Sequence, residues 1–487
     1  MNPLGPPNSA KAVSASFSDI DEIFRSFAER QRLPGLAYGV TASGGLVHSG
    51  AVGLARLQPE RQVAVDTVFR IASMTKSITA ACVLILRDRG QLRLDDEVAT
   101  YVPEAATMAL PTRDSQPITV RQLLTMSAGL VEDDPWADRQ LAMAPDDFSS
   151  LLAGVQFSRP PGVAFEYSNL GYALLGRVVA NVAGVSVSQF ANENLLEPLG
   201  MFDTRWEAGM VPSDRRADGH RLRDGKWEVE EPLTDGAFGA MGGLWTTVPD
   251  FARYLSFHLE AWPPRDDEDR GPLARASRRE MQQPHRPVSV AERRPPGVAL
   301  AGYGYGLMAG DRRGGGRVVY HSGGLPGFGS HVQALPDLGL GVVGFANLTY
   351  APMWQVVAEA AEFLAQSAAA GSPPPEAFPA LDSLRAQVVG LYEQWDDEVV
   401  LALAADNLLL DLDLDHRRQE VGVLRGRLGR CLEVGPLEPR GAMRGGWRLR
   451  CERGDVRVEV RLAPSRPPRL QALTFTEGDR SEGAAAT

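Results

Sequence analysis

The sequence predicts a protein of mixed α and β structure that is followed by a smaller, all-β domain. Between residues 18 and 370, stretches with apolar residues at helical spacing alternate with short strand-like stretches punctuated by glycine. From about residue 384 onward, short alternating segments follow one another with turns between them. That pattern is typical of a small antiparallel barrel or sandwich of roughly 100 residues. Residues 371–379, GSPPPEAFP, lie between the two parts and predict a linker.

The elements of the larger part follow in order from local patterns. Residues 18–32 place apolar side chains on one face of an amphipathic helix, which Pro34 and Gly35 end. Residues 36–55 alternate around glycines and predict a hairpin. Further helices are predicted over residues 73–89, 118–126, 169–182 and 353–370. Strands are predicted over residues 317–321 and 339–346.

Polar residues and glycines mark the ends of these helices. Thr119 is the expected N-cap of the helix 118–126, and Ser168 or Asn169 is the expected cap of the helix that follows it. Gly90 and Gly184 come directly after the last periodic residues of two helices and predict where these helices end.

The remaining stretches are assigned from their composition. Residues 1–17 are rich in Ser, Ala and Pro and are expected to be flexible. Residues 263–297 are charged and proline-rich, which predicts an insertion that is at least partly mobile. The small barrel is expected to span residues 380–480, and residues 481–487 are expected to form a tail.

Charge and cysteine content restrict the function classes. The 487 residues carry 50 basic and 61 acidic side chains, and this net charge of −11 argues against a protein that tracks nucleic-acid phosphates. No run of about 18 apolar residues occurs and the N-terminal residues lack an apolar signal core, so neither a membrane span nor export is expected. Cys82, Cys431 and Cys451 cannot build a disulfide framework and fit the cytoplasm. The last two lie in neighbouring strand-like segments, where they could face each other.

Ser73-Met74-Thr75-Lys76 is the first motif that could carry chemistry. An extended segment precedes it and a helix follows, so Ser73 is expected at a helix N-terminus with Lys76 one turn further on the same face. A serine hydroxyl needs a base beside it to act as a nucleophile, and a lysine of lowered pKa can be that base. The helix N-terminus adds an N–H group for an oxyanion. The structural alternative is a serine N-cap followed by a surface lysine.

Tyr167-Ser168-Asn169 lies between a Pro/Gly-rich turn and a helix start, where side chains can point into a cleft. A tyrosine close to a lysine can share its proton and pass it to a leaving group. An asparagine can hydrogen-bond both an amide substrate and the lysine. The alternative is a buried tyrosine followed by an asparagine that caps the helix.

His321-Ser322-Gly323-Gly324 follows the predicted strand 317–321. Glycine at this place lets a substrate lie against the strand backbone, and the N–H of Gly324 could be a second oxyanion donor. The alternative is a strand-end turn that requires glycine.

In this order and spacing, the three motifs resemble those of the serine β-lactamase and penicillin-binding-protein superfamily. The chain looks closest to the class C β-lactamase-like branch, with its DD-carboxypeptidases, D-aminopeptidases and carboxylesterases. The similarity covers about residues 15–365, through stretches such as DTVFRIASMTKSITA, FEYSNLGYALLG and HSGGLPGF. It implies an α+β (β-lactamase-like) fold over residues 18–370, in which helices flank an antiparallel sheet beside an all-helical subdomain. The C-terminal segment resembles the small lipocalin-like barrels that follow some such domains.

The resemblance also implies catalytic roles. Ser73 is the expected acylated nucleophile, and Lys76 and Tyr167 are expected to share general-base and general-acid duty. Neither a metal nor an organic cofactor is expected. The expected partner is a small ester, amide or short peptide, with self-association into a homodimer left open.

Four further residues are implied in substrate binding: Asn169, His321, Gly323 and Gly324. Gly324 would form the oxyanion hole together with the N–H of Ser73. His321 stands where β-lactamases usually carry lysine, and histidine is neutral or charged near pH 7. This substitution weakens the case for β-lactams and peptide C-termini, and it favours esters or neutral amides.

The stretch LLTMSAGL departs from the family pattern as well, because Met126, Ser127 and Ala128 replace a polar His-Thr-Ser trio. The cleft is less polar if this loop lines it, and otherwise the change reflects packing only.

A hydrolase that forms an acyl-serine on esters, amides or D-amino-acid peptides is therefore the predicted function. A β-lactamase or a DD-carboxypeptidase ranks below it, and a catalytically idle scaffold or binding protein is the alternative from another class. Other enzyme classes lack their motifs: the seven histidines show no metal-ligand spacing, and no Gly-x-Ser-x-Gly elbow occurs. GYGYG at residues 302–306 lacks the following helix of a dinucleotide site.

Overall fold

The computed structural model of the chain describes residues 13–288, 297–369 and 379–478. The chain divides into two compact units, Met1–Gly371 and Ser372–Thr487, and each unit has its own apolar core. Residues 1–12, the predicted linker apart from Pro379, and the predicted tail lie outside the described residues.

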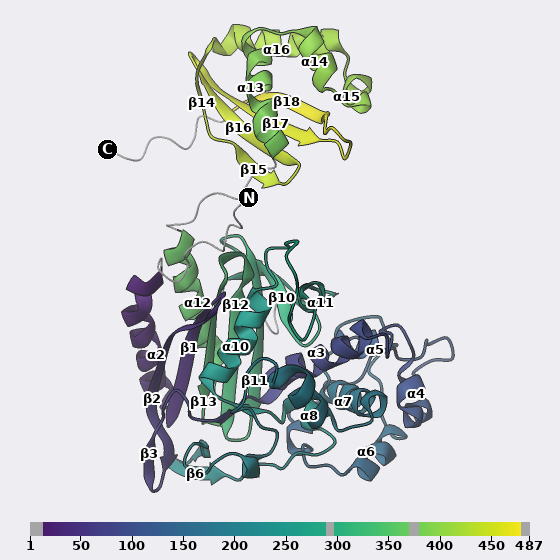
Figure 1. The fold of residues 1–487 in the computed structure, drawn as a ribbon, viewed down its shortest axis with the longest axis vertical. Helices are drawn as coiled ribbons and strands as arrows, with labels where there is room; N and C mark the ends of the chain where they lie inside the picture. Colours follow the sequence, from purple (N-terminus) through teal and green to yellow (C-terminus); the bar gives the residue numbers. More distant parts are fainter. Residues whose placement is uncertain (1–12, 289–296, 370–378, 479–487) are drawn as a thin grey trace. The chain divides into compact units, whose positions relative to one another are not determined.

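The larger unit is built on one large antiparallel sheet (Figure 1). The N-terminal hairpin consists of β1 (Gly35–Ala42) and β2 (Gly45–Leu57), and its strand β1 pairs with β13 (Leu340–Ala346). Strands from the two ends of this unit therefore lie side by side inside the sheet. Within the described residues the sheet has nine strands, in the order β3 (Glu60–Gln62), β2 (Gly45–Leu57), β1 (Gly35–Ala42), β13 (Leu340–Ala346), β12 (Phe328–Leu335), β11 (Arg317–Leu325), β10 (Met308–Arg312), β9 (Val298–Tyr303) and β8 (Arg286–Pro287).

Helices cover both faces of this sheet (Figure 1). The inner strand β13 shows both helical layers: Leu255 packs over Gly341, whereas Met353 and Val357 pack over Gly344. Positions three apart on a strand point to opposite faces. The helices that carry these residues are α10 (Val248–Leu259) on one face, and α12 (Met353–Ala369) with its neighbour α2 (Phe17–Gln31) on the other.

A helical subdomain lies beside the sheet (Figure 1). Thr119 forms a capping box with Gln122 at the start of its helix, and the Ser168 hydroxyl accepts from the N–H of Gly171. Gly184 ends the latter helix in a left-handed conformation, with φ of 72°. These predicted boundaries are confirmed. The subdomain contains α3 (Thr75–Asp88), α4 (Val98–Tyr101), α5 (Val120–Leu124), α6 (Pro145–Leu152), α7 (Asn169–Ala183), α8 (Val187–Ala191) and α9 (Gly239–Gly242). Two short ribbons, β4 (Phe69–Arg70) with β7 (Trp245–Thr246) and β5 (Gly219–Arg223) with β6 (Lys226–Glu230), complete the unit.

Much of the predicted insertion 263–297 is built into this unit. Its residues form α11 (Arg275–Met281) and the edge strand β8, while residues 289–296 lie outside the described part of the chain. Met281 and Arg278 are buried, and the Arg278 guanidinium donates to the carbonyl of Phe257. The stretch is rich in charged residues, but its arginines bond backbone carbonyls and neighbouring aspartates within the fold. Composition alone does not distinguish such arginines from those of a mobile insertion.

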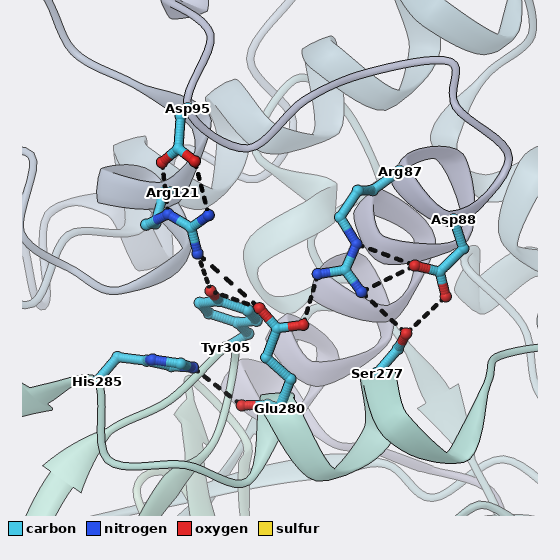
Figure 2. Close-up of polar contacts among 8 residues, drawn as sticks. All are labelled: Arg87, Asp88, Asp95, Arg121, Ser277, Glu280, His285 and Tyr305. Atoms are coloured by element: carbon cyan, nitrogen blue, oxygen red, sulfur yellow. Dashed lines mark hydrogen bonds and ion pairs between the residues drawn. The ribbon is translucent and has the colours of Figure 1, made fainter.

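A network of charged side chains, here called the Glu280 network, ties α11 to the helical subdomain (Figure 2). Glu280 accepts from Arg87 of α3 at 2.6 Å and from the Tyr305 hydroxyl at 3.1 Å. Arg121 of α5 in turn donates to Tyr305 at 2.5 Å and binds Asp95 through two nitrogens. The network comprises Arg87, Asp88, Asp95, Arg121, Ser277, Glu280, His285 and Tyr305.

The smaller unit contains the predicted antiparallel sheet, but only in its second half. The sheet consists of β14 (Cys431–Val434), β15 (Glu438–Gly441), β16 (Arg444–Cys451), β17 (Gly454–Leu462) and β18 (Leu470–Glu477). The first half consists of the helices α13 (Pro379–Glu393), α14 (Asp397–Leu403), α15 (Asp406–Asp411) and α16 (Leu414–Leu428).

The prediction of strands between residues 384 and 428 was therefore wrong. Leu384, Val388 and Leu391 are buried at intervals of four and three, which is the helical period. Such closely spaced apolar residues fit a short alternating segment as well as a helix. Because helices take the first half, few strands remain, and the sheet of the described residues is open. Its edges are β18 on one side, and β14 and β15, which both pair with β16, on the other.

Two features of the sequence have simple structural outcomes. The register of β14 and β16 sets Cys431 opposite Cys451, and both are free thiols. Among the described residues no single helix is long and apolar enough to cross a membrane; α7 and residues Val187–Leu196 meet that test only as a pair bent by 77°.

Candidate active site

Ser73 lies on a 3-10 turn, Ala72–Met74, directly before α3. The preceding residue Ile71 holds this turn, because its N–H donates to Leu244 and its carbonyl accepts from the Ser330 hydroxyl at 2.7 Å. Ala72 has a φ of 49°, an uncommon value for a residue with a side chain. Backbone strain of this kind persists where the surrounding structure enforces it. Ser73 itself is partly exposed, as a nucleophile must be.

Lys76 is completely buried one turn along α3 and is surrounded by oxygen atoms. Its Nζ donates to Ser73 Oγ at 2.8 Å, to Asn169 Oδ1 at 2.6 Å and to the carbonyl of Met241 at 2.9 Å. Three acceptors match the three N–H groups of an ammonium ion. We call Ser73, Lys76, Asn169 and the Met241 carbonyl the Lys76 network.

The same geometry suits a neutral lysine that acts as a base. Asn169 Oδ1 and the Met241 carbonyl oxygen can only accept hydrogen bonds, so they retain the two N–H groups of a neutral amine. The amine lone pair then has Ser73 Oγ as its remaining neighbour in this network. Proton transfer between Ser73 and Lys76 therefore needs no movement of the lysine.

Aromatic rings close the space around Lys76. Nζ lies 5.0 Å from the ring centre of Tyr167 and 5.8 Å from that of Tyr172. Both rings are buried, and the Tyr172 hydroxyl donates to the carbonyl of Leu124 at 2.9 Å. Burial raises the pKa of Tyr172 well above its ordinary value. The ring faces stabilise the cation and keep water away from it.

His321 lies in the middle of β11, with its ring centre 6.3 Å from that of Tyr167. The strand does not end at residue 321 as predicted, because Ser322, Gly323 and Gly324 continue the pairing with β12. Its Nδ1 is 2.6 Å from the carbonyl oxygen of Ser322, and its Nε2 is 3.3 Å from the Tyr303 hydroxyl. A carbonyl only accepts, so Nδ1 carries a proton, and Nε2 shares its hydrogen bond with a hydroxyl that can donate or accept.

Gly323 and Gly324 bring β11 against the turn that carries the nucleophile. A Cβ atom on Gly323 would lie 2.2 Å from the carbonyl oxygen of Ile71, so a larger residue would push the strand away from Ser73. A Cβ on Gly324 would lie 2.9 Å from the ring of Tyr350. The pairing of the Gly324 and Ser73 N–H groups as an oxyanion hole stays a prediction.

The loop before α6 holds the N-terminus of α7 through two carboxylates. Asp133 accepts from the N–H groups of Asn169 and Leu170, at 2.7 Å and 2.8 Å. Burial raises the pKa of Asp133, and these two backbone hydrogen bonds oppose the rise. Its neighbour Asp134 accepts a hydrogen bond from the side-chain amide of Asn169. The Asn169 side chain therefore lies between Lys76 and Asp134.

The same loop carries a third carboxylate, Asp138, and this one is buried. Asp138 accepts from the Tyr350 hydroxyl at 2.9 Å, and Tyr350 in turn lies beside Gly324. Burial, and then the negative charge of Asp134, raise the pKa of Asp138 to about 7. A carboxyl group that titrates near neutral pH thus lies one side chain away from β11.

The stretch Met126, Ser127 and Ala128 is buried beneath the second motif. The Met126 carbonyl accepts from the N–H of Glu166, and its sulfur lies 3.3 Å from the N–H of Ser168. Of the two interpretations of this substitution, the structure supports packing.

The seven residues singled out in the sequence come from three places that these contacts bring together: the start of α3, the start of α7 and residues 321–324 of β11. Sequence patterns missed four groups that complete the site: Asp133, Asp134, the Met241 carbonyl and Tyr303. Tyr303 belongs to the GYGYG stretch, and in the sequence this stretch shows only that it lacks the pattern of a dinucleotide site. Among the described residues, no three His, Cys, Asp or Glu side chains form a group that could hold a metal ion.

Comparison with known proteins gives a consistent family. The family model named Beta-lactamase matches residues 20–366. The protein flp of Staphylococcus aureus strain N315 is 25% identical over 342 residues, 69% of this chain and 64% of the relative. The chain therefore spans less than two thirds of that relative's length. Beta-lactamase-like protein 2 of Dictyostelium discoideum is 28% identical over 52% of this chain and 47% of its own length.

Solved structures share the fold. An octameric penicillin-binding protein homologue from Pyrococcus abyssi matches with a TM-score of 0.63 and 21% identity, over 94% of this chain and 99% of its own. A class C beta lactamase matches with a TM-score of 0.58 and 20% identity, over 72% of this chain and 99% of its own. At these identities the likeness concerns the fold alone. Because the family model covers most of the chain, this protein belongs to the beta-lactamase family.

Proposed function

We propose that the chain is a serine hydrolase that forms an acyl-enzyme on Ser73 and acts on esters or on amides, D-amino-acid peptides included. One observation carries the proposal: the amine of a completely buried lysine lies 2.8 Å from Ser73 Oγ, between two oxygens that can only accept. A serine with a positioned base beside it is an activated nucleophile.

The reaction would proceed in two halves. In the first, Ser73 Oγ bonds to the substrate carbonyl carbon, the bond to the leaving oxygen or nitrogen breaks, and the Oγ proton reaches the leaving group through Lys76 or Tyr167. In the second, a water oxygen bonds to the same carbon and the bond to Oγ breaks. The proton of that water returns to Oγ, and the acid is released.

The third motif supports esters and amides over substrates that carry a carboxylate. A substrate carboxylate is bound best by a permanent cation. His321 is buried, and both of its ring nitrogens have neutral partners, the Ser322 carbonyl and the Tyr303 hydroxyl. A β-lactamase or DD-carboxypeptidase remains the runner-up, because solved class C enzymes share the fold.

The experiment is intact-mass analysis after treatment with a fluorophosphonate. One adduct is expected on the wild type and on Ser149→Ala, which removes a serine hydroxyl of α6 that bonds the Pro145 carbonyl. No adduct is expected on Ser73→Ala. A folded wild type without an adduct would instead support an idle scaffold with inherited motifs. Equal labelling of Ser73→Ala would move the nucleophile elsewhere.

Turnover of a 4-nitrophenyl ester, a D-amino-acid amide and a β-lactam then ranks the substrate classes. The proposal expects the first two to be turned over. Release of a hydrolysed β-lactam as the fastest reaction would favour the runner-up.

A further inference from the structure

The side-chain amide of Asn169 is engaged on both of its sides. Its oxygen accepts from Lys76 Nζ at 2.6 Å, and its nitrogen donates to the carboxylate of Asp134. Asn169 is completely buried, whereas Asp134 is exposed. The Asp134 carboxylate is therefore linked through one side chain, that of Asn169, to the lysine that contacts Ser73.

Asp134 is held in this place by the residue before it. Asp133 anchors the loop on α7 with two backbone hydrogen bonds, at 2.7 Å and 2.8 Å. These bonds are made to Asn169 itself and to Leu170, so the loop and the asparagine are fixed to the same helical turn. The carboxylate of Asp134 consequently stays over the amide that it binds.

The contact between Asn169 and Asp134 replaces hydrogen-bond donors by acceptors at the place where a substrate would be bound. A free asparagine amide offers N–H donors, which suit a carbonyl oxygen of the substrate. A carboxylate offers only acceptors, with room for several donors, and it repels a carbonyl oxygen placed against it. An N–H group that carries a positive charge fits best, because hydrogen bonds between charged partners are the strongest.

We propose that Asp134 determines the specificity of this site and selects acyl groups that carry a protonated amine next to the reacting carbonyl. The substrate class is then an ester or amide of an amino acid with a free α-amino group. This inference rests on the proposed acyl-enzyme function and names its substrate.

The charges around Asp134 agree with this selection. Asp134 is one of the groups whose negative charge raises the pKa of Asp133 and of Asp138. Lys76 is the cation that opposes them, and its three N–H groups are directed to Ser73, Asn169 and Met241. A substrate ammonium group would relieve the repulsion among these carboxylates.

The test compares D- and L-alanine 4-nitroanilide with their N-acetyl counterparts, and uses 4-nitrophenyl butyrate as an ester without a polar group at this position. For the wild type at pH 7, kcat/KM for the better free amine is expected to exceed that of its N-acetyl partner by about tenfold to a hundredfold. The ratio should fall above pH 8, because a free α-amino group loses its proton near that pH.

Two variants distinguish the effect of the Asp134 carboxylate from the effect of the loop that carries it. Asp134→Asn removes the charge and keeps the size, so the ratio should fall at least about tenfold. Asp134→Ala frees the amide of Asn169, which can then bind the acetyl carbonyl, so the ratio should fall further or reverse. Asp147→Asn, an exposed aspartate of α6, loses the same charge and should leave the ratio unchanged.

The outcomes also distinguish this inference from the proposed function. If the fluorophosphonate labels Ser73 and the butyrate ester is hydrolysed, but both Asp134 variants keep the wild-type ratio, Asp134 is not the specificity determinant. A wild type that prefers the N-acetyl substrates would overturn the inference in the same way. Absence of any Ser73 adduct would instead refute the proposed hydrolase.

Discussion

The Lys76 network and the Glu280 network involve opposite ends of one helix, α3, and they differ in their surroundings. Near the start of the helix, Lys76 is completely buried, and its nitrogen has three oxygen partners at 2.6–2.9 Å. Near the end, the Arg87 side chain is 22% exposed and pairs with Glu280, which is 32% exposed (Figure 2). Both networks join a cation of α3 to partners from distant parts of the chain.

This difference shows how burial changes the free-energy cost of losing one partner of a hydrogen-bonded cation. Water can replace a lost partner in the Glu280 network, so each of its ion pairs contributes little net free energy. No such replacement is available around Lys76, where a lost donor leaves a carbonyl oxygen unsatisfied. The buried network can therefore hold a proton-transfer geometry, while the exposed network joins two segments of the fold.

Replacing the α3 cation of each network in turn is the strongest test of this contrast. Lys76→Met keeps the apolar stem and removes the amine, so we expect Ser73 acylation to slow by about 10³-fold. Arg87→Met removes the other cation of α3 and should change the acylation rate less than about threefold. The Arg87 guanidinium bonds Glu280, Asp88 and Ser277, and none of these belongs to the Lys76 network.

Fluorophosphonate labelling rates, with thermal melting of each variant, measure this difference. Both variants must be folded at the assay temperature for the comparison to hold. A Lys76→Met protein that keeps a tenth or more of the wild-type rate would show that another group removes the serine proton.

Asp138 offers a test of burial that depends on pH. Its pKa is about 7 in the folded protein, chiefly because of burial, and about 4 in an unfolded chain. Between these values the folded state holds a proton that the unfolded chain has released, so this contribution to stability falls as pH rises from 4 to 7. Above pH 7 the folded state carries the full cost of a buried carboxylate, which is at most about 4 kcal/mol.

Asp138→Asn removes this cost and keeps an oxygen that can accept from Tyr350. The variant should therefore be more stable than the wild type at pH 8, and the advantage should vanish near pH 4. Urea unfolding of both proteins between pH 4.5 and 8.5 gives the difference. The same difference at every pH would mean that Asp138 does not titrate in this window.

Local geometry explains which parts of the site were predictable from sequence. Ser73 and Lys76 are three residues apart on a helix, and this spacing alone places them on one face. Ser168 caps α7 through its own side chain, so the positions of Tyr167 just before that helix and of Asn169 at its first residue were also predictable. Their joint presence in one site followed from the resemblance of the three motifs to a known family.

The groups that escaped prediction reach the site by other means. The Met241 group is a backbone carbonyl, which has no residue signature, and Asp133 and Asp134 come from a loop whose path the sequence does not specify. The prediction for the smaller unit was wrong for a different reason. The apolar residues Val421, Leu424 and Leu428 recur at helical intervals, but the apolar stretches of this region are short. The strand patterns that follow them therefore led to the prediction of strands here as well.

Glu280→Gln should give the smallest effect of these substitutions. It removes the charge that faces Arg87 and keeps an oxygen that can accept from the Tyr305 hydroxyl, so we expect a loss of less than about 1 kcal/mol in the free energy of unfolding. The loss should shrink at high salt, because the pair is partly exposed and screened. The rate of Ser73 acylation should stay within twofold of the wild type. Urea unfolding at low and high salt, beside the labelling rate, tests both statements. A loss above about 2 kcal/mol, or a large fall in rate, would mean that the Glu280 network supports the site through α3 as strongly as the buried network does.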